Sequence, residues 1–121
     1  MTEKQWRECL GELVRDYMRS PEMDFYFSIK INKPRAAVMV KQQSLFVRHR
    51  RECWSHVSAN CPVMGVKQGI LEHEYEEVIH DDYSDYGHLE LIIRQGKSVG
   101  LEPDEIINAE PTLETRAVLY G

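Results

Sequence analysis

Prolines and glycines divide this chain of 121 residues into segments that each have the length of a helix. Proline lacks the amide proton that a helix interior needs, and glycine tolerates the backbone angles found just beyond a helix end. These residues fall at Pro21, Pro34, Pro62, Gly87, Gly100, Pro103 and Pro111. The sequence therefore predicts an all-α fold, with residues 1–121 forming a single helical domain or part of one.

Start signals and apolar spacing locate the helices between these breaks. Thr2 and Gln5 have the form of a capping box, and apolar residues then recur at helical spacing as far as Met18. Asn32 can cap a long helix that reaches about residue 59, with Pro34 in its first turn. We expect further helices over residues 62–82 and 88–99, and two short ones that begin near Pro103 and Pro111.

One segment has a different period. Phe25, Phe27, Ile29 and Ile31 alternate with more polar residues, which is the period of a strand. A single strand would have no partner in this chain, so we expect residues 25–31 to form an extended connection.

Composition excludes several classes of protein. No apolar run approaches the ~18 residues of a membrane span, and the N-terminus lacks the basic-then-apolar order of a signal peptide. The net charge of −5 argues against a general nucleic-acid surface, and the basic cluster from Arg48 to Arg51 is interpreted as a solvated helix face. Three scattered cysteines form no metal or disulfide pattern. We expect a cytoplasmic protein that binds neither membranes nor nucleic acid.

Several ionisable residues share a helix face with apolar ones. In the helix over residues 62–82, Glu74 and Asp81 fall on the edge of the expected buried side and Glu77 lies beside them, whereas His73 and His80 point to solvent. The apolar residues that define this side are Ile70, Leu71, Tyr75, Val78 and Ile79. The alternative interpretation is that these charged residues belong to a solvent-exposed face that has no sharp boundary with the apolar side.

Inward polar residues recur in the two neighbouring helices. His88 lies on the stripe of Ile92, and Gln42, His49 and His56 lie along the apolar stripe of the long helix. Each buried polar group left unpaired costs about 1–3 kcal/mol, so several on facing helices imply a shared polar cavity or a metal ion. Carboxylates and imidazoles from neighbouring helices are the ligands of helical di-iron and di-manganese sites.

The segment from Trp54 to Ile106 resembles the haem-oxygenase-like superfamily, in the branch of TenA, PqqC and the non-haem iron oxidases. Three pieces carry the resemblance: the turn Asn60-Cys61-Pro62, the acidic LEHEYEE that leads to Gly87-His88, and GKSVGLEPDEI. The following PTLETRAVLYG is similar to the start of that fold's next helix.

The resemblance implies a haem-oxygenase-like helical bundle, of which this chain would be the N-terminal half. In the iron-using branch it implies a carboxylate ligand, matched by Asp81 or Glu77, and a histidine ligand, matched by His88. Members usually have Glu where this chain has Asp81. The family's later His-x-x-x-Asp-x-x-His cluster has no counterpart before Gly121.

The function expected from these observations is an iron-dependent oxidase or oxygenase that acts on a small molecule with O₂ as co-substrate. Non-haem iron, one ion or two, would be bound by Glu74, Glu77, Asp81 and His88, and the substrate would contact Gln42, His49 and His56. The missing ligands would come from a C-terminal half or from the second copy of a homodimer. Two alternatives stay open: a metal-free PqqC- or TenA-like enzyme, and a non-catalytic helical interaction module.

Overall fold

The computed structural model describes residues 1–121, and every regular element in it is a helix. The all-α expectation is therefore confirmed. The chain divides into two compact units, Met1–Ile31 and Asn32–Gly121. None of the helices combines the length and the apolar character that crossing a bilayer would require.

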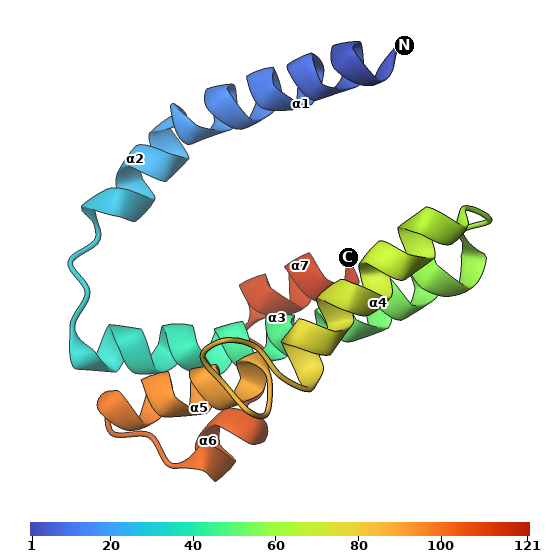
Figure 1. Ribbon diagram of the computed structural model, residues 1–121. Coiled ribbons are helices and arrows are strands. Elements are labelled where there is room, and N and C mark those ends of the chain that lie inside the picture. Colours follow the sequence, from blue (N-terminus) through green and yellow to red (C-terminus); the bar gives the residue numbers. More distant parts are fainter. The chain divides into compact units, whose positions relative to one another are not determined.

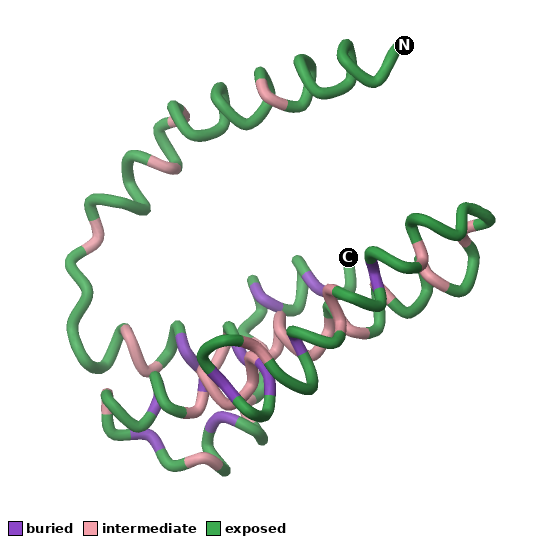
Figure 2. Tube along the Cα trace, viewed as in Figure 1, coloured by how far each residue is buried: buried purple, intermediate pink, exposed green.

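The unit Met1–Ile31 consists of two helices, α1 (Glu3–Met18) and α2 (Pro21–Ser28) (Figure 1). The expected capping box is present: the Thr2 backbone N–H donates to Gln5 Oε1 at 2.8 Å, and Thr2 Oγ1 accepts from the Gln5 backbone N–H at 3.3 Å. Neither helix contains a buried residue (Figure 2). Trp6 and Leu10, each 54% exposed, belong to an apolar face of α1 that its own unit leaves uncovered.

The expectation of an extended connection over residues 25–31 is wrong for residues 25–28, which belong to α2. Ser20 caps this helix, since its Oγ accepts from the Met23 backbone N–H at 3.3 Å. Pro21 occupies the first turn, where an amide proton has no helical partner in any case. These two signals outweigh the alternation of Phe25 and Phe27, and the extended backbone begins only at Ile29.

The unit Asn32–Gly121 is built around α3 (Lys33–Asn60), which starts at the expected cap, Asn32. After a short turn, α4 (Met64–Val78) runs back beside the C-terminal half of α3 (Figure 1). The remaining three helices also contact α3; they are α5 (His88–Ser98), α6 (Pro103–Ile107) and α7 (Leu113–Tyr120).

The apolar core lies where α3, α5 and α6 meet. It consists of Val40, Ile92, Leu101 and Ile106, of which Ile106 is completely buried. Gly96 on α5 permits this packing, because a Cβ at that position would overlap the Ile106 side chain. Buried Ser44 on α3 lies with its Oγ 2.9 Å from the Ile106 carbonyl oxygen, which ties α6 to α3. Glu74 and Glu77 of α4 pair with Arg51 of α3 outside this core.

The buried side expected for α4 is only partly right, because Ile70 is buried as expected and most of the other residues of that side are exposed. Leu71, Tyr75 and Val78 are 64%, 52% and 51% exposed, while Ile70 and Glu77 on the face toward α3 are 7% and 8% exposed. Apolar residues occur on both faces of α4, so periodicity alone does not identify the face that packs.

The stripe expected for α3 is also only partly right. Gln42 and His49 on that stripe are half-buried and His56 is exposed, whereas Val40 and Ser44 on the other side of the helix are buried. Four helices contact α3; they are α4, α5, α6 and α7. The buried residues of α3 are therefore not confined to a single stripe.

Candidate metal centre

The charged residues between α4 and α5 form one half-buried cluster. Glu77, in the last turn of α4, has its Oε1 3.0 Å from Nδ1 of His88, the first residue of α5. The other ring nitrogen, Nε2, lies 2.8 Å from Oδ2 of Asp81 in the intervening loop. The imidazole therefore lies between two carboxylates, and it donates to both only when both nitrogens carry protons.

Gly87 brings His88 to the end of α4. Its φ of 71° lies in the left-handed region, which side chains with a Cβ rarely adopt. A Cβ here would lie 2.7 Å from the Val78 carbonyl carbon and still closer to the Glu77 carbonyl oxygen. The chain can therefore return this closely to α4 only with glycine at position 87.

The loop that contains Asp81 is closed by its own hydrogen bonds. The backbone N–H of Asp81 donates to the Ser84 carbonyl at 3.0 Å, and the Ser84 N–H donates back at 3.3 Å. Asp81 Oδ1 accepts from the Tyr83 N–H at 2.6 Å, so its other oxygen, Oδ2, is the one that faces His88. The loop thus fixes the orientation of the Asp81 carboxylate.

Ser84 attaches the loop to α5. It is 4% exposed, and its Oγ lies 2.7 Å from both the Gly87 carbonyl oxygen and Glu90 Oε2. The pKa of Glu90 is lowered by the Ser84 hydroxyl and then by the Arg94 guanidinium, which both donate to this carboxylate. Arg94 also donates to the Tyr83 carbonyl at 2.9 Å. The first turns of α5 and the loop are therefore joined by a charged, hydrogen-bonded network.

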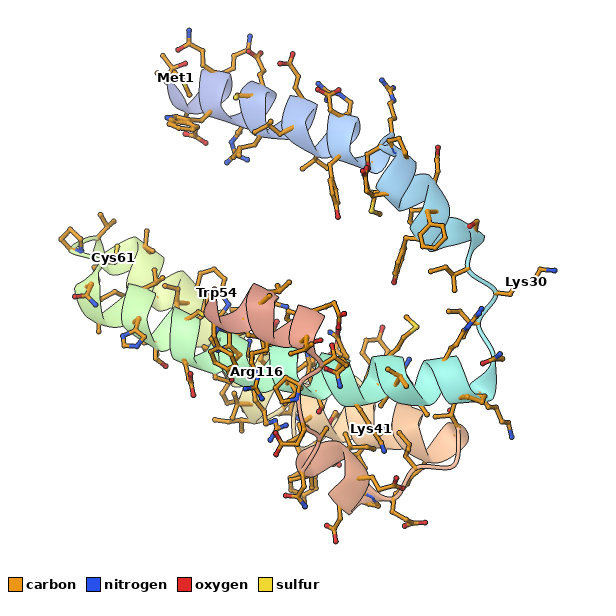
Figure 3. The ribbon with its side chains drawn as sticks, turned by 180° about the vertical axis from the view of Figure 1, so that it is seen from behind. Met1, Lys30, Lys41, Trp54, Cys61 and Arg116 are labelled. Carbon is orange, nitrogen blue, oxygen red and sulfur yellow. The ribbon has the colours of Figure 1, made fainter.

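A guanidinium from α3 completes the cluster. Arg51 Nη1 lies 2.8 Å from Glu77 Oε2, and its Nε lies 3.3 Å from Glu74 Oε2. The Arg51 and Glu74 side chains are each 19% exposed. On the other side of Glu77, His73 Nε2 lies 3.7 Å from Oε1 and its ring meets Trp54 edge-on. Trp54, labelled in Figure 3, belongs to the part of α3 that runs beside α4.

Comparison of the chain with protein-family models, curated proteins and solved structures finds no match. Its chemistry must therefore be argued from the cluster itself. No three His, Cys, Asp or Glu side chains are arranged here as they would be around an ion. The reason is the His88 ring, which lies between the carboxylates of Glu77 and Asp81.

The donor set nevertheless suits a divalent cation. Carboxylate oxygens and imidazole nitrogens are the ligands that iron, manganese and zinc use in proteins. These ligands bind metal in their deprotonated forms, so metal binding at this cluster would release protons and depend on pH. The three residues therefore fit a cation in type, but Glu77 and Asp81 lie at different ring nitrogens of His88, so an ion bound by all three requires the ring to move from between them.

A cavity of about 410 Å³ lies beside His88. Its other lining residues come from the end of α4 and the loop; they are Tyr75, Glu76, His80, Asp81, Asp82 and Tyr83. The cavity gives a small molecule access to the side of the cluster formed by Asp81 and His88.

The structure brings the four predicted ligands together: Glu77, Asp81 and His88 are in direct contact, and Glu74 is joined to them through Arg51. The orientation expected for His73 is only partly right, because its half-exposed ring contacts Trp54 and Glu77. The spacing of these residues along α4 and the loop predicted that they lie close together, and their role as metal ligands stays a prediction.

The three residues expected to contact substrate lie elsewhere. Gln42 holds the start of α7, donating to the Glu110 carbonyl at 3.1 Å and accepting from the Thr112 N–H at 2.9 Å. His49 packs edge-on against Tyr120 of α7, and His56 is exposed. None of Gln42, His49 and His56 lines the cavity beside His88.

Sequence reasoning missed three residues that build the site: Arg51, Ser84 and Gly87. The interpretation of residues 48–51 as a solvated face is wrong for Arg51, and for Arg48, whose Nη1 donates to the Ile107 carbonyl at 2.7 Å. Arg51 could have been found by asking which basic residue of α3 neutralises the carboxylates of α4, since α4 contains more acidic than basic residues. Ser84 and Gly87 act through loop geometry, for which the sequence contains no periodic signal.

Proposed function

We propose that this chain is one part of an iron-dependent oxidase or oxygenase of the haem-oxygenase-like type that acts on a small molecule. The observation that carries the proposal is the convergence of Glu77, Asp81 and His88 from a helix end, a loop and a helix start. Grouping ionisable residues in a half-buried position is costly unless they are paired or hold a cation. The resemblance of residues 54–106 to the iron-using branch, which implies a carboxylate ligand at Asp81 or Glu77 and a histidine ligand at His88, supports the same conclusion.

In this proposal the chain's own residues bind and orient. Glu77 and Asp81 would supply oxygen ligands and His88 a nitrogen ligand, with Ser84 and Gly87 holding the loop that presents them. The cavity beside His88 would admit the substrate along the Tyr75 side. Iron bound there would supply electrons to O₂ at a coordination position that the protein leaves open.

Metal analysis tests the proposal directly. After anaerobic reconstitution with Fe²⁺ and desalting, we expect near-stoichiometric iron in the wild-type chain and less than about one tenth of that in His88→Ala, since loss of a ligand typically lowers affinity by more than the 10–100-fold seen for supporting residues. His56→Ala is the matched control, because His56 is exposed on α3, does not line the cavity beside His88, and should leave iron content unchanged. Wild-type protein without bound iron, or full retention in His88→Ala, would contradict the proposal.

One observation favours a second candidate, a metal-free PqqC- or TenA-like enzyme. His88 has a carboxylate at each ring nitrogen and borders a cavity, which is an arrangement suited to proton transfer to or from a bound substrate. In this case the wild-type chain would bind no iron, and His88→Ala would abolish activity without any change in metal content.

We further propose that the chain forms a homodimer. The exposed α4 stripe of Leu71, Tyr75 and Val78 adjoins the cavity, which Tyr75 also lines. A contiguous exposed apolar stripe indicates a surface that another chain covers. A covering copy would also bring further side chains to the cluster, where one chain offers fewer ligands than a complete iron site uses.

Sedimentation equilibrium tests self-association. We expect a dimer in the wild-type chain and a shift to monomer in Tyr75→Lys, because a charge on the stripe opposes burial of its neighbours. Glu72→Lys adds the same charge type on an exposed position of α4 outside the stripe and should leave the dimer intact. A cooperatively folded wild-type monomer at all concentrations would contradict this proposal. It would favour the non-catalytic interaction module, in which the apolar stripe of α4 binds a different protein.

A further inference from the structure

A second cavity, of about 320 Å³, lies between the C-terminal half of α3 and α4. Its volume falls within the range of small-molecule binding sites in proteins. It shares no lining residue with the cavity beside His88. The residues that line it are Arg50, Trp54, Val66, Gly69, Ile70 and His73.

The walls of this second cavity are aromatic and apolar. The rings of Trp54 and His73 meet edge-on, with their centroids 5.9 Å apart, and both residues are half-buried. Ile70, which is 7% exposed, and Val66 add aliphatic surface from α4. Flat aromatic molecules pack favourably against such rings, either offset-stacked or edge-on. The cavity therefore suits a ligand with a flat apolar body.

Gly69 leaves the second cavity open on the α4 side. A Cβ at this position would meet no atom within 4 Å, so no part of the chain fills the space directly around it. A side chain introduced at position 69 can therefore extend into the cavity, and its first carbon overlaps no atom of the protein.

Arg50 gives the second cavity a positive charge that the chain does not neutralise. It is exposed and, unlike Arg48 and Arg51, it has no hydrogen-bond or ion-pair partner. None of the residues that line the cavity is acidic. The carboxylates of Glu74 and Glu77 on α4 pair with Arg51 instead. A guanidinium matches a carboxylate through parallel N–H donors, so the free charge selects an anion.

We propose that the second cavity binds a small aromatic carboxylate, with its ring against Trp54 and His73 and its carboxylate at Arg50. The inference goes beyond the proposed iron-dependent function, because no lining residue of this cavity is a proposed metal ligand. It holds whether or not the cluster around His88 binds iron.

The experiment is an NMR titration of the full, isotope-labelled chain with naphthalene-2-carboxylate. The indole N–H of Trp54 reports on the cavity, and that of Trp6 on α1, the other tryptophan of the chain, is the internal control. In the wild type we expect a saturable shift of the Trp54 signal with a Kd of about 1 mM or lower, and no shift of the Trp6 signal. Naphthalene-2-carboxamide has the same shape without the charge, so it should bind about tenfold more weakly.

Two sets of variants test the position and the charge separately. Gly69→Leu fills the cavity and should abolish the shift of the Trp54 signal. Gly65→Leu is the matched control, because Gly65 is also on α4 with no atom within 4 Å of a Cβ, yet it does not line the cavity. Arg50→Met should remove the preference for the carboxylate over the carboxamide. Gly69→Met serves if Gly69→Leu does not fold.

The outcomes that overturn the inference are equally distinct. Absence of a saturable Trp54 shift in the wild type, or wild-type affinity in a folded Gly69→Leu or Gly69→Met chain, would show that the ligand does not occupy this cavity. Equal affinities for the two probes in the wild type, or an undiminished preference for the carboxylate in Arg50→Met, would show that Arg50 does not select an anion.

Discussion

Gly87→Ala should destabilise the unit Asn32–Gly121 by at least about 3 kcal/mol, a loss that only a few mechanisms produce. An alanine at the observed φ of 71° pays about 1–2 kcal/mol for the left-handed backbone alone. Its Cβ would also press on the backbone of Glu77 and Val78, which cannot move without disturbing the last turn of α4. Urea denaturation followed by circular dichroism measures the loss as a lower midpoint at unchanged slope.

Gly100 provides the control that separates the two contributions. It also has a positive φ, 93°, but a Cβ there would meet no atom within 4 Å. Gly100→Ala should therefore cost only the backbone term, about 1–2 kcal/mol. Equal losses in Gly87→Ala and Gly100→Ala would show that the close approach of the loop to α4 is absent in solution.

The same substitution should weaken metal binding. His88 follows Gly87 directly, and a shift that relieves the overlap moves its ring away from Glu77 Oε1. We therefore expect a Gly87→Ala chain that still folds to retain iron less well than the wild type, although every proposed ligand is present. The backbone conformation at position 87 thus affects iron retention although Gly87 is not itself a ligand.

The parts of the fold that local chemistry decides could be predicted from the sequence. The caps at Thr2 and Asn32 form as expected because a cap depends on residues three or four positions away. The segment at residues 25–28 was missed because two short-range signals compete there, and the proline-and-serine start of α2 prevails over the alternation of its aromatic residues.

The face that α4 buries could not be predicted, because it depends on a residue of another helix. Glu77 packs against α3 only because Arg51 meets it there, whereas Leu71 and Tyr75 remain exposed. Periodicity placed Glu77 only beside a side that also contained Leu71 and Tyr75, because it contains no information on the cation that a carboxylate meets. The proposed ligands were found nonetheless, because Glu77, Asp81 and His88 surround a single helix end, where loop closure brings them together whichever face of α4 is buried.

Glu77→Ala should produce the second large loss, about 3 kcal/mol or more, because breaking a buried ion pair leaves a charge without compensation. Glu77 is 8% exposed and contacts Arg51 and His88, so Arg51 would lose its nearest carboxylate and His88 one of its two. Arg51 keeps Glu74 at 3.3 Å, which places the expected value at the lower end of the range for such pairs. The free energy of unfolding in urea is the measurement.

Glu76→Ala is the matched control for this loss, since Glu76 is the exposed neighbour of Glu77 and its removal should change stability by no more than about 0.5 kcal/mol. The double variant Glu77→Leu with Arg51→Met replaces the pair by apolar side chains and should recover most of the stability. Failure of the double variant to exceed Glu77→Ala in stability would mean that Glu77 acts mainly through His88. A loss below about 1 kcal/mol in Glu77→Ala would mean that Glu77 is solvated and that the cluster does not hold the helices together.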